Sequence, residues 1–136
     1  MEFFRSLKGA NPALRNLGAA AAAITRGAGV YLDEAGVKPA AGDKKPEGIA
    51  LATVAAGGEV LVEVVSEDAE YYIEPASGVT ASDIKPGKAY TLSTDGVTLA
   101  KTAGTAVVVN RALEDGYIVC FKQMHYLNYC KRESTP

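Results

Sequence analysis

The stretch that decides the fold occurs twice. Residues 24–40 read ITRGAGVYLDEAGVKPA, and residues 84–100 read IKPGKAYTLSTDGVTLA. At this spacing (84 − 24 = 60), identical residues are Ile24, Gly27, Leu32, Gly36, Val37 and Ala40, matched by Ile84, Gly87, Leu92, Gly96, Val97 and Ala100. After a shortening of two residues, Ile49, Leu51, Gly58, Val60 and Leu61 align with Val107, Val109, Gly116, Ile118 and Val119. The pattern predicts an internal duplication; the alternative is independent use of the same β-turn sequences.

Each copy has the pattern of short strands joined by turns. The sequences DEAG (33–36) and STDG (93–96) are typical of hairpin turns, because acidic and small polar side chains bond their own backbone and glycine accepts positive φ. Apolar residues alternate in EVLVEVV (59–65), and short apolar runs recur at AVVVN (106–110) and YIVCF (117–121). Four strands per copy predict an all-β chain of two related small β-barrel or sandwich units. The residues expected to face the cores are Val60, Val62, Ile118 and Cys120.

This pattern divides the chain into five parts. We expect an irregular N-terminal arm (1–23), a first β unit (24–65), a bridging segment (66–83), a second β unit (84–123) and a C-terminal tail (124–136). Within the arm, Asn11-Pro12 is typical of the start of a short helix. The arm either packs on its own domain or docks onto a neighbouring subunit. Tyr71 to Ile73 are expected to form a strand that bridges the two halves.

Composition argues against several classes of partner. The net charge of −2 supplies no strong field for a phosphate backbone, so we expect no nucleic acid. No run approaches the roughly 18 apolar residues of a membrane span, and residues 1–24 lack the continuous apolar region of a signal peptide. Cys120 and Cys130 are expected to be reduced thiols in a protein made in the cytoplasm.

The residues offer no catalytic constellation. His125 is the single histidine, and with Cys120 and Cys130 it makes three ligands at spacings that match no familiar zinc pattern. The GAG at 27–29 is better explained by a turn than by nucleotide binding. We therefore predict a protein that is not an enzyme and holds no metal or cofactor.

Residues 22–64 resemble a known family. The run AAITRGAGVYLD (22–33), followed by GVKPAAGDKKPEGIALATVAAGGEVLVEV (36–64), is similar to the small β-barrel head decoration, or capsid cement, proteins of tailed bacteriophages. The resemblance lies in the turn that opens a VYLD strand, the GV-x-PA hairpin, the polar loop and the GIAL strand. It implies a virion protein that binds the outer surface of the capsid through the major capsid protein, as a homo-oligomer and often a trimer. The family usually shows one barrel, whereas this sequence carries two copies.

Apolar and basic residues at the two ends are the expected contacts. Phenylalanine, leucine and tyrosine side chains would be buried against capsid or neighbouring subunits, and basic ones would face acidic partner surface. The contact residues predicted in this way are Phe3, Phe4, Arg5, Leu7, Leu14, Tyr126 and Tyr129. The loop 38–48, with Lys44 and Lys45, is expected to be a solvated connection or part of the functional edge. The alternatives are another virion or tail component and a small ligand-binding barrel.

Overall fold

The computed structural model describes residues 1–9 and 11–121 of the 136. These residues form eleven strands in two antiparallel sheets, and no helix. The strands are β1 (Glu2–Ser6), β2 (Leu14–Ala19), β3 (Gly29–Asp33), β4 (Gly36–Pro39), β5 (Gly48–Ala50), β6 (Glu59–Val64), β7 (Ala69–Ile73), β8 (Ala89–Leu92), β9 (Leu99–Ala103), β10 (Val107–Ala112) and β11 (Tyr117–Cys120). The predicted all-β class is confirmed. Neither sheet closes into a barrel.

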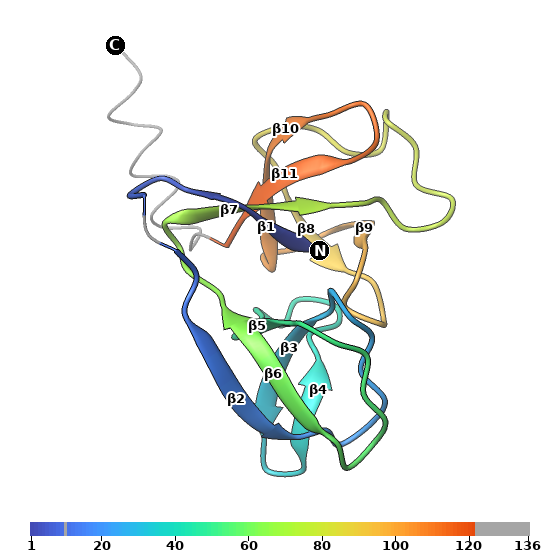
Figure 1. The fold of residues 1–136 in the computed structure, drawn as a ribbon. Helices are drawn as coiled ribbons and strands as arrows, with labels where there is room; N and C mark the ends of the chain where they lie inside the picture. The colour runs from blue at the N-terminus through green and yellow to red at the C-terminus, as the bar shows by residue number, and fades with distance from the viewer. Residues whose placement is uncertain (10, 122–136) are drawn as a thin grey trace.

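The two sheets share one strand order. The five-stranded sheet is ordered β2-β6-β5-β3-β4, and the six-stranded sheet is ordered β1-β7-β11-β10-β8-β9. We number the strands within each sheet from β2 in one and from β7 in the other. Both sheets then have the spatial order first, fifth, fourth, second, third, and the larger sheet has β1 as an additional strand beside β7. We call β2–β6 the first unit and β7–β11 the second unit; Figure 1 shows them as the lower and upper halves of the molecule. The repeated unit is therefore longer by one strand than the sequence comparison predicted.

The doubled phrase encodes the same turn in both units. Thr25–Ala28 and Lys85–Lys88 are each closed by a hydrogen bond from the fourth N–H to the first carbonyl, and the third residue, Gly27 or Gly87, has φ of +86° or +85°. Such a turn requires positive φ at its third position, which glycine adopts without steric cost. The Gly27 N–H then donates to Ala50 O, as the Gly87 N–H donates to Val109 O. Both turns thus attach to the fourth strand of their own unit in the same way.

Strand pairing corrects part of the sequence alignment. The pair Leu32↔Val37 encloses residues 33–36, whereas the matching pair Leu92↔Leu99 encloses residues 93–98, so the second hairpin is two residues longer. The buried counterpart of Val37 is therefore Leu99, and each forms a parallel bridge, to Ala20 and to Pro75 respectively. The identities Gly36/Gly96, Val37/Val97 and Ala40/Ala100 consequently do not occupy equivalent positions. Similarly, the hydrogen bonds from Gly27 and Gly87 align Ala50, not Leu51, with Val109.

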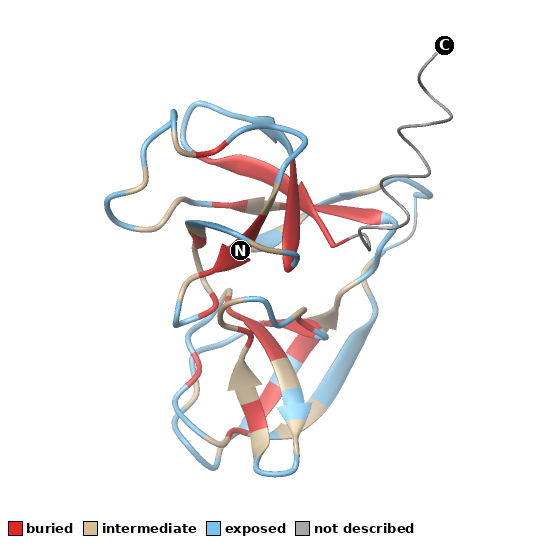
Figure 2. Ribbon diagram, turned by 180° about the vertical axis from the view of Figure 1, so that it is seen from behind, coloured by how far each residue is buried: buried red, intermediate tan, exposed pale blue. Residues whose placement is uncertain are grey.

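Two apolar cores lie within this framework. The smaller one fills the first unit and includes Val30, Val37, Val60 and Val62, each at most 1% exposed. The larger one fills the second unit and also takes Ala40 and Ile49 from the first unit. The expected core residues Val60, Val62, Ile118 and Cys120 are all buried. Figure 2 shows buried strands in both units, with exposed residues concentrated in the loops and along β2.

The predicted irregular arm is wrong. Residues 2–6 and 14–19 are strands, one in each sheet, and the helix expected after Asn11-Pro12 does not form because Leu14–Ala19 pairs with β6. The bridging segment is also structured: Ala69–Ile73 is β7, paired with β1 on one side and β11 on the other. The strand expected at Tyr71 to Ile73 is confirmed, and it belongs to the second unit.

Candidate functional site

The N-terminal strands run as a ribbon across both units. β1 pairs antiparallel with β7, and β2 pairs antiparallel with β6. Between them, the Leu7 N–H donates to Asp68 O at 2.7 Å, and the Val64 N–H donates to Ala13 O at 2.8 Å. Residues 1–19 therefore lie alongside residues 59–73 and join the two units, as the blue segment of Figure 1 shows. Of the two readings open from the sequence, packing against its own domain is the one observed.

The two adjacent phenylalanines occupy different environments. Phe3 packs against the larger core, with its ring centroid 6.0 Å from that of Tyr71 in an edge-to-face arrangement. Phe4 lies at a register shift in the β1–β7 ladder and is 43% exposed. The Arg111 guanidinium lies 5.5 Å from the centroid of the Phe4 ring. Phe3 thus packs against the core while partly exposed, and Phe4 leaves more of its side chain accessible.

Three of the predicted contact residues form an exposed apolar series. Phe4, Leu7 and Leu14 are 43%, 52% and 71% exposed. We call these three residues the N-terminal strip. Leu61 on β6, 54% exposed, lies diagonally across the β2–β6 ladder from Leu14 and adds to the apolar surface of the first unit. Because these side chains sit on or beside paired strands, they are presented by a backbone that is already fixed.

Two basic residues of the same segment, Arg5 and Lys8, already have acidic partners. The Arg5 Nε lies 2.5 Å from Glu70 Oε1, and the Lys8 Nζ lies 3.4 Å from Asp68 Oδ2. Arg5 and Lys8 therefore attach β1 to β7 and to the residue that precedes it, Asp68. Arg15 is exposed and takes part in no ion pair within the part of the chain that the structure describes.

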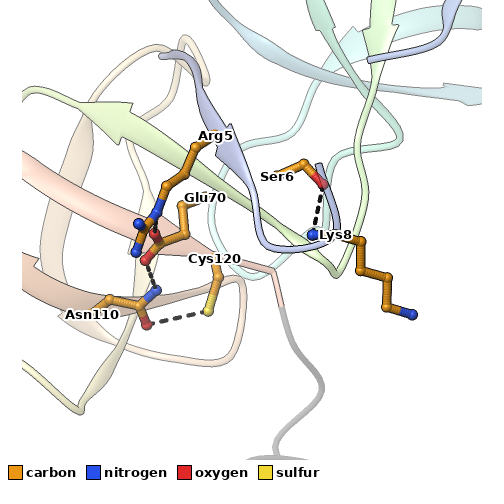
Figure 3. Close-up of polar contacts among 6 residues, drawn as sticks. All are labelled: Arg5, Ser6, Lys8, Glu70, Asn110 and Cys120. Atoms are coloured by element: carbon orange, nitrogen blue, oxygen red, sulfur yellow. Dashed lines mark hydrogen bonds and ion pairs between the residues drawn. The ribbon is translucent and has the colours of Figure 1, made fainter. Parts of the chain in front are cut away.

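Glu70 is the centre of a buried polar network that the sequence did not indicate. Its second oxygen accepts a hydrogen bond from Asn110 Nδ2 at 2.7 Å, and the Cys120 thiol donates to Asn110 Oδ1 at 3.4 Å (Figure 3). Burial raises the pKa of Glu70, but the hydrogen bonds from Arg5 and Asn110 outweigh it and hold that pKa below its usual range. The network links four neighbouring strands, β1, β7, β11 and β10, and its role is to hold these strands together.

The polar loop at 38–48 connects the two units and is not merely solvated. Gly42 and Leu92 exchange backbone hydrogen bonds of 3.0 Å, and Asp43 Oδ1 accepts from the Thr105 N–H at 2.6 Å. Lys45 Nζ donates to Phe121 O at 3.1 Å, while Lys44 Nζ lies 4.6 Å from the Tyr31 ring centroid. The corresponding connection in the second unit, between Ala103 and Val107, is much shorter. We call residues 38–48 the clamp, because their hydrogen bonds attach the first unit to the second.

A half-open cleft of about 430 Å³ lies where the units meet. Its walls come from β1, the Arg26–Gly27 turn, β5, β6, β7 and the 97–98 turn, and its charged residues are Glu2, Arg26, Glu63 and Glu74. A cleft of this volume falls within the range of small-molecule sites. The sequence did not predict it, because its walls come from segments far apart in the chain.

Several sequence predictions fall outside the described residues: Tyr126, Tyr129, His125 and Cys130. Cys120 is buried in β11. Among residues 1–9 and 11–121, no group of three histidine, cysteine or acidic side chains is placed to hold a metal ion. The same residues include no helix that is long and apolar enough to cross a membrane. Comparison with models of known protein families, and with curated protein sequences, finds no match for the chain.

Proposed function

We propose that this protein is a structural virion protein that binds the outer surface of a tailed-phage capsid and stabilises it. The observation that carries the proposal is the N-terminal strip: three large apolar side chains remain exposed on a segment that spans both units. Large exposed apolar side chains that gather on one segment favour a binding partner for that segment. The resemblance of residues 22–64 to capsid cement proteins supplies the identity of that partner, the major capsid protein.

A rigid, two-unit β protein suits this task. The clamp at 38–48 and the N-terminal ribbon both cross between the units, so a load applied to one unit passes to the other. Because the strip needs no ordering on binding, most of the apolar area that it buries contributes to affinity. In this proposal the protein acts outside the capsid as a homo-oligomer, with a trimer expected from the resemblance, and carries out no reaction.

Co-sedimentation with purified heads of the virus that encodes the chain tests the proposal. Phe4→Ser, Leu7→Ser and Leu14→Ser are combined in one variant. If each residue loses burial of about half a side chain, roughly 1 kcal/mol apiece, affinity falls about a hundredfold. The matched control combines Leu32→Ser and Leu113→Ser, which are 47% and 39% exposed and lie outside the strip. Full binding by the strip variant, or equal loss in the control, would contradict the proposal.

The cleft between the units supports a second candidate, a small ligand-binding protein. Its volume of about 430 Å³ and its mixture of apolar and charged walls are the specific observation. Native mass spectrometry of protein purified without chromatography in strong salt would reveal a co-purified small molecule. A single species at the mass of the bare chain or its oligomer would argue against this candidate.

A further inference from the structure

A second cavity, of about 200 Å³, lies where the chain crosses between the units. It sits under the crossing of residues 11–13 with residues 64–69. Its lining is mostly apolar, and its polar residues are Ser6, Asn11 and Ser66. The apolar lining is formed mainly by Phe3, Pro12, Val64, Val65, Ala69 and Tyr71. The cavity therefore offers space for one ring that carries a polar group.

The described chain ends beside this cavity. The ring of Phe121, the last described residue, lies 5.2 Å from the ring of Tyr71, and Tyr71 also contacts Phe3. Lys45 binds the Phe121 carbonyl and so fixes the point from which the remaining chain continues. Fifteen residues follow (136 − 121 = 15), and Tyr126 is the first aromatic residue among them. Five residues span at most about 18 Å, which is enough to reach a cavity one ring away.

The chemistry of the cavity fits a phenol. An apolar cavity of about 150 Å³ accepts a benzene ring, and a buried tyrosine hydroxyl needs a hydrogen-bond partner. Ser6 Oγ and Ser66 Oγ each accept a backbone hydrogen bond, from Lys8 and Asp68 respectively. Neither hydroxyl donates a hydrogen bond within residues 1–9 and 11–121, so both are available to a phenolic oxygen.

We propose that this cavity is the docking site for the Tyr126 side chain of the same chain. This inference does not depend on the proposed function, and it replaces the capsid contact that the sequence predicted for Tyr126 with an intramolecular one.

The absence of tryptophan from the chain makes a direct test possible. Tyr126→Trp places a single fluorescent reporter at the proposed docking residue, and Ser134→Trp places one near the chain end as the control. We expect blue-shifted emission and several-fold weaker quenching by acrylamide for Tyr126→Trp. Emission equal to that of Ser134→Trp would overturn the proposal.

A blocking variant then ties the signal to this cavity. Ala13 is exposed but lines the cavity, so Ala13→Leu fills part of it, whereas Ala19→Leu makes the same change at the far end of β2. In the Tyr126→Trp background, Ala13→Leu should shift the emission to the red, and Ala19→Leu should not. Circular dichroism verifies that each variant is folded. An unchanged emission with Ala13→Leu in a folded protein would overturn the proposal, as would a blue shift that disappears on dilution, which would indicate docking into a second copy.

Discussion

Phe3→Ala and Phe4→Ala should separate stability from binding at neighbouring positions. Phe3 is partly buried and its ring meets Tyr71, itself 1% exposed, in an edge-to-face contact. Truncating a fully buried phenylalanine costs about 3–5 kcal/mol, so a partly buried one should cost about 2–3 kcal/mol, including the lost ring contact. Phe4 is 43% exposed, and its truncation removes mainly the contact with Arg111, worth roughly 0.5–1 kcal/mol.

Urea unfolding monitored by circular dichroism measures the difference, and head co-sedimentation supplies the second readout. A loss of about 2–3 kcal/mol in a chain of this size lowers Tm by roughly 10 °C. At a temperature where both variants are folded, Phe3→Ala should bind heads like the parent and Phe4→Ala should bind more weakly. Equal destabilisation by the two changes would refute the assigned orientation of β1. Normal binding by Phe4→Ala would remove that residue from the contact surface.

Three further comparisons test the fold. Val62→Asp places a carboxylate in the core of the first unit and should lower the free energy of unfolding by several kcal/mol. Leu61→Asp, one residue away on the exposed face, should lower it little. Similar urea midpoints for the two variants would show that the strand register is wrong. Gly27→Ala and Gly87→Ala should each lower the free energy of unfolding by about 1 kcal/mol, because alanine is strained at positive φ. The loss should be larger at Gly27, where an added Cβ would lie 3.1 Å from the Met1 backbone nitrogen, than at Gly87, where no atom lies within 4 Å. Equal losses of stability in urea unfolding would contradict this. Because the pKa of Glu70 is lowered on folding, its stabilising contribution is present above the carboxyl's unfolded pKa and is lost as pH falls through the folded value; Glu70→Gln should therefore lose less stability between pH 5 and pH 2 than the parent, and parallel pH profiles would rule the network out as the cause.

The repeated turns were predictable because their physics is local. Gly27 and Gly87 are required at positive φ whatever surrounds them, so the glycines and the short strands after them appear directly in the sequence. The register of the hairpins was not predictable in the same way. The second hairpin is two residues longer than the first. The Gly-Val pairs at 36–37 and 96–97 therefore align in sequence but, by the strand pairing, do not occupy equivalent positions.

The N-terminal strands could not be recognised from their own residues. FFRS and LRNLGA have no clear alternation of apolar and polar residues, because each strand lies at the edge of a sheet and buries little. Their pairing is determined by β7 and β6, whose paired residues are at least 40 positions away in sequence. A glutamate within the otherwise apolar strand AEYYI was the one available signal, since a buried carboxylate requires partners such as Arg5 and Asn110.

The duplication also explains why the strip lies where it does. In the second unit, β1 covers the outer edge of β7, but the first unit has no equivalent strand, so β2 remains an edge. An open edge invites pairing with another chain, and β2 opposes this with the charged Arg15 and with a register shift between Asn16 and Gly18. A partner of the first unit is therefore expected to bind the side chains of Leu14 and Leu61 and not to extend the sheet. Capsid binding should then depend on the leucine side chains and be insensitive to changes confined to the β2 backbone edge.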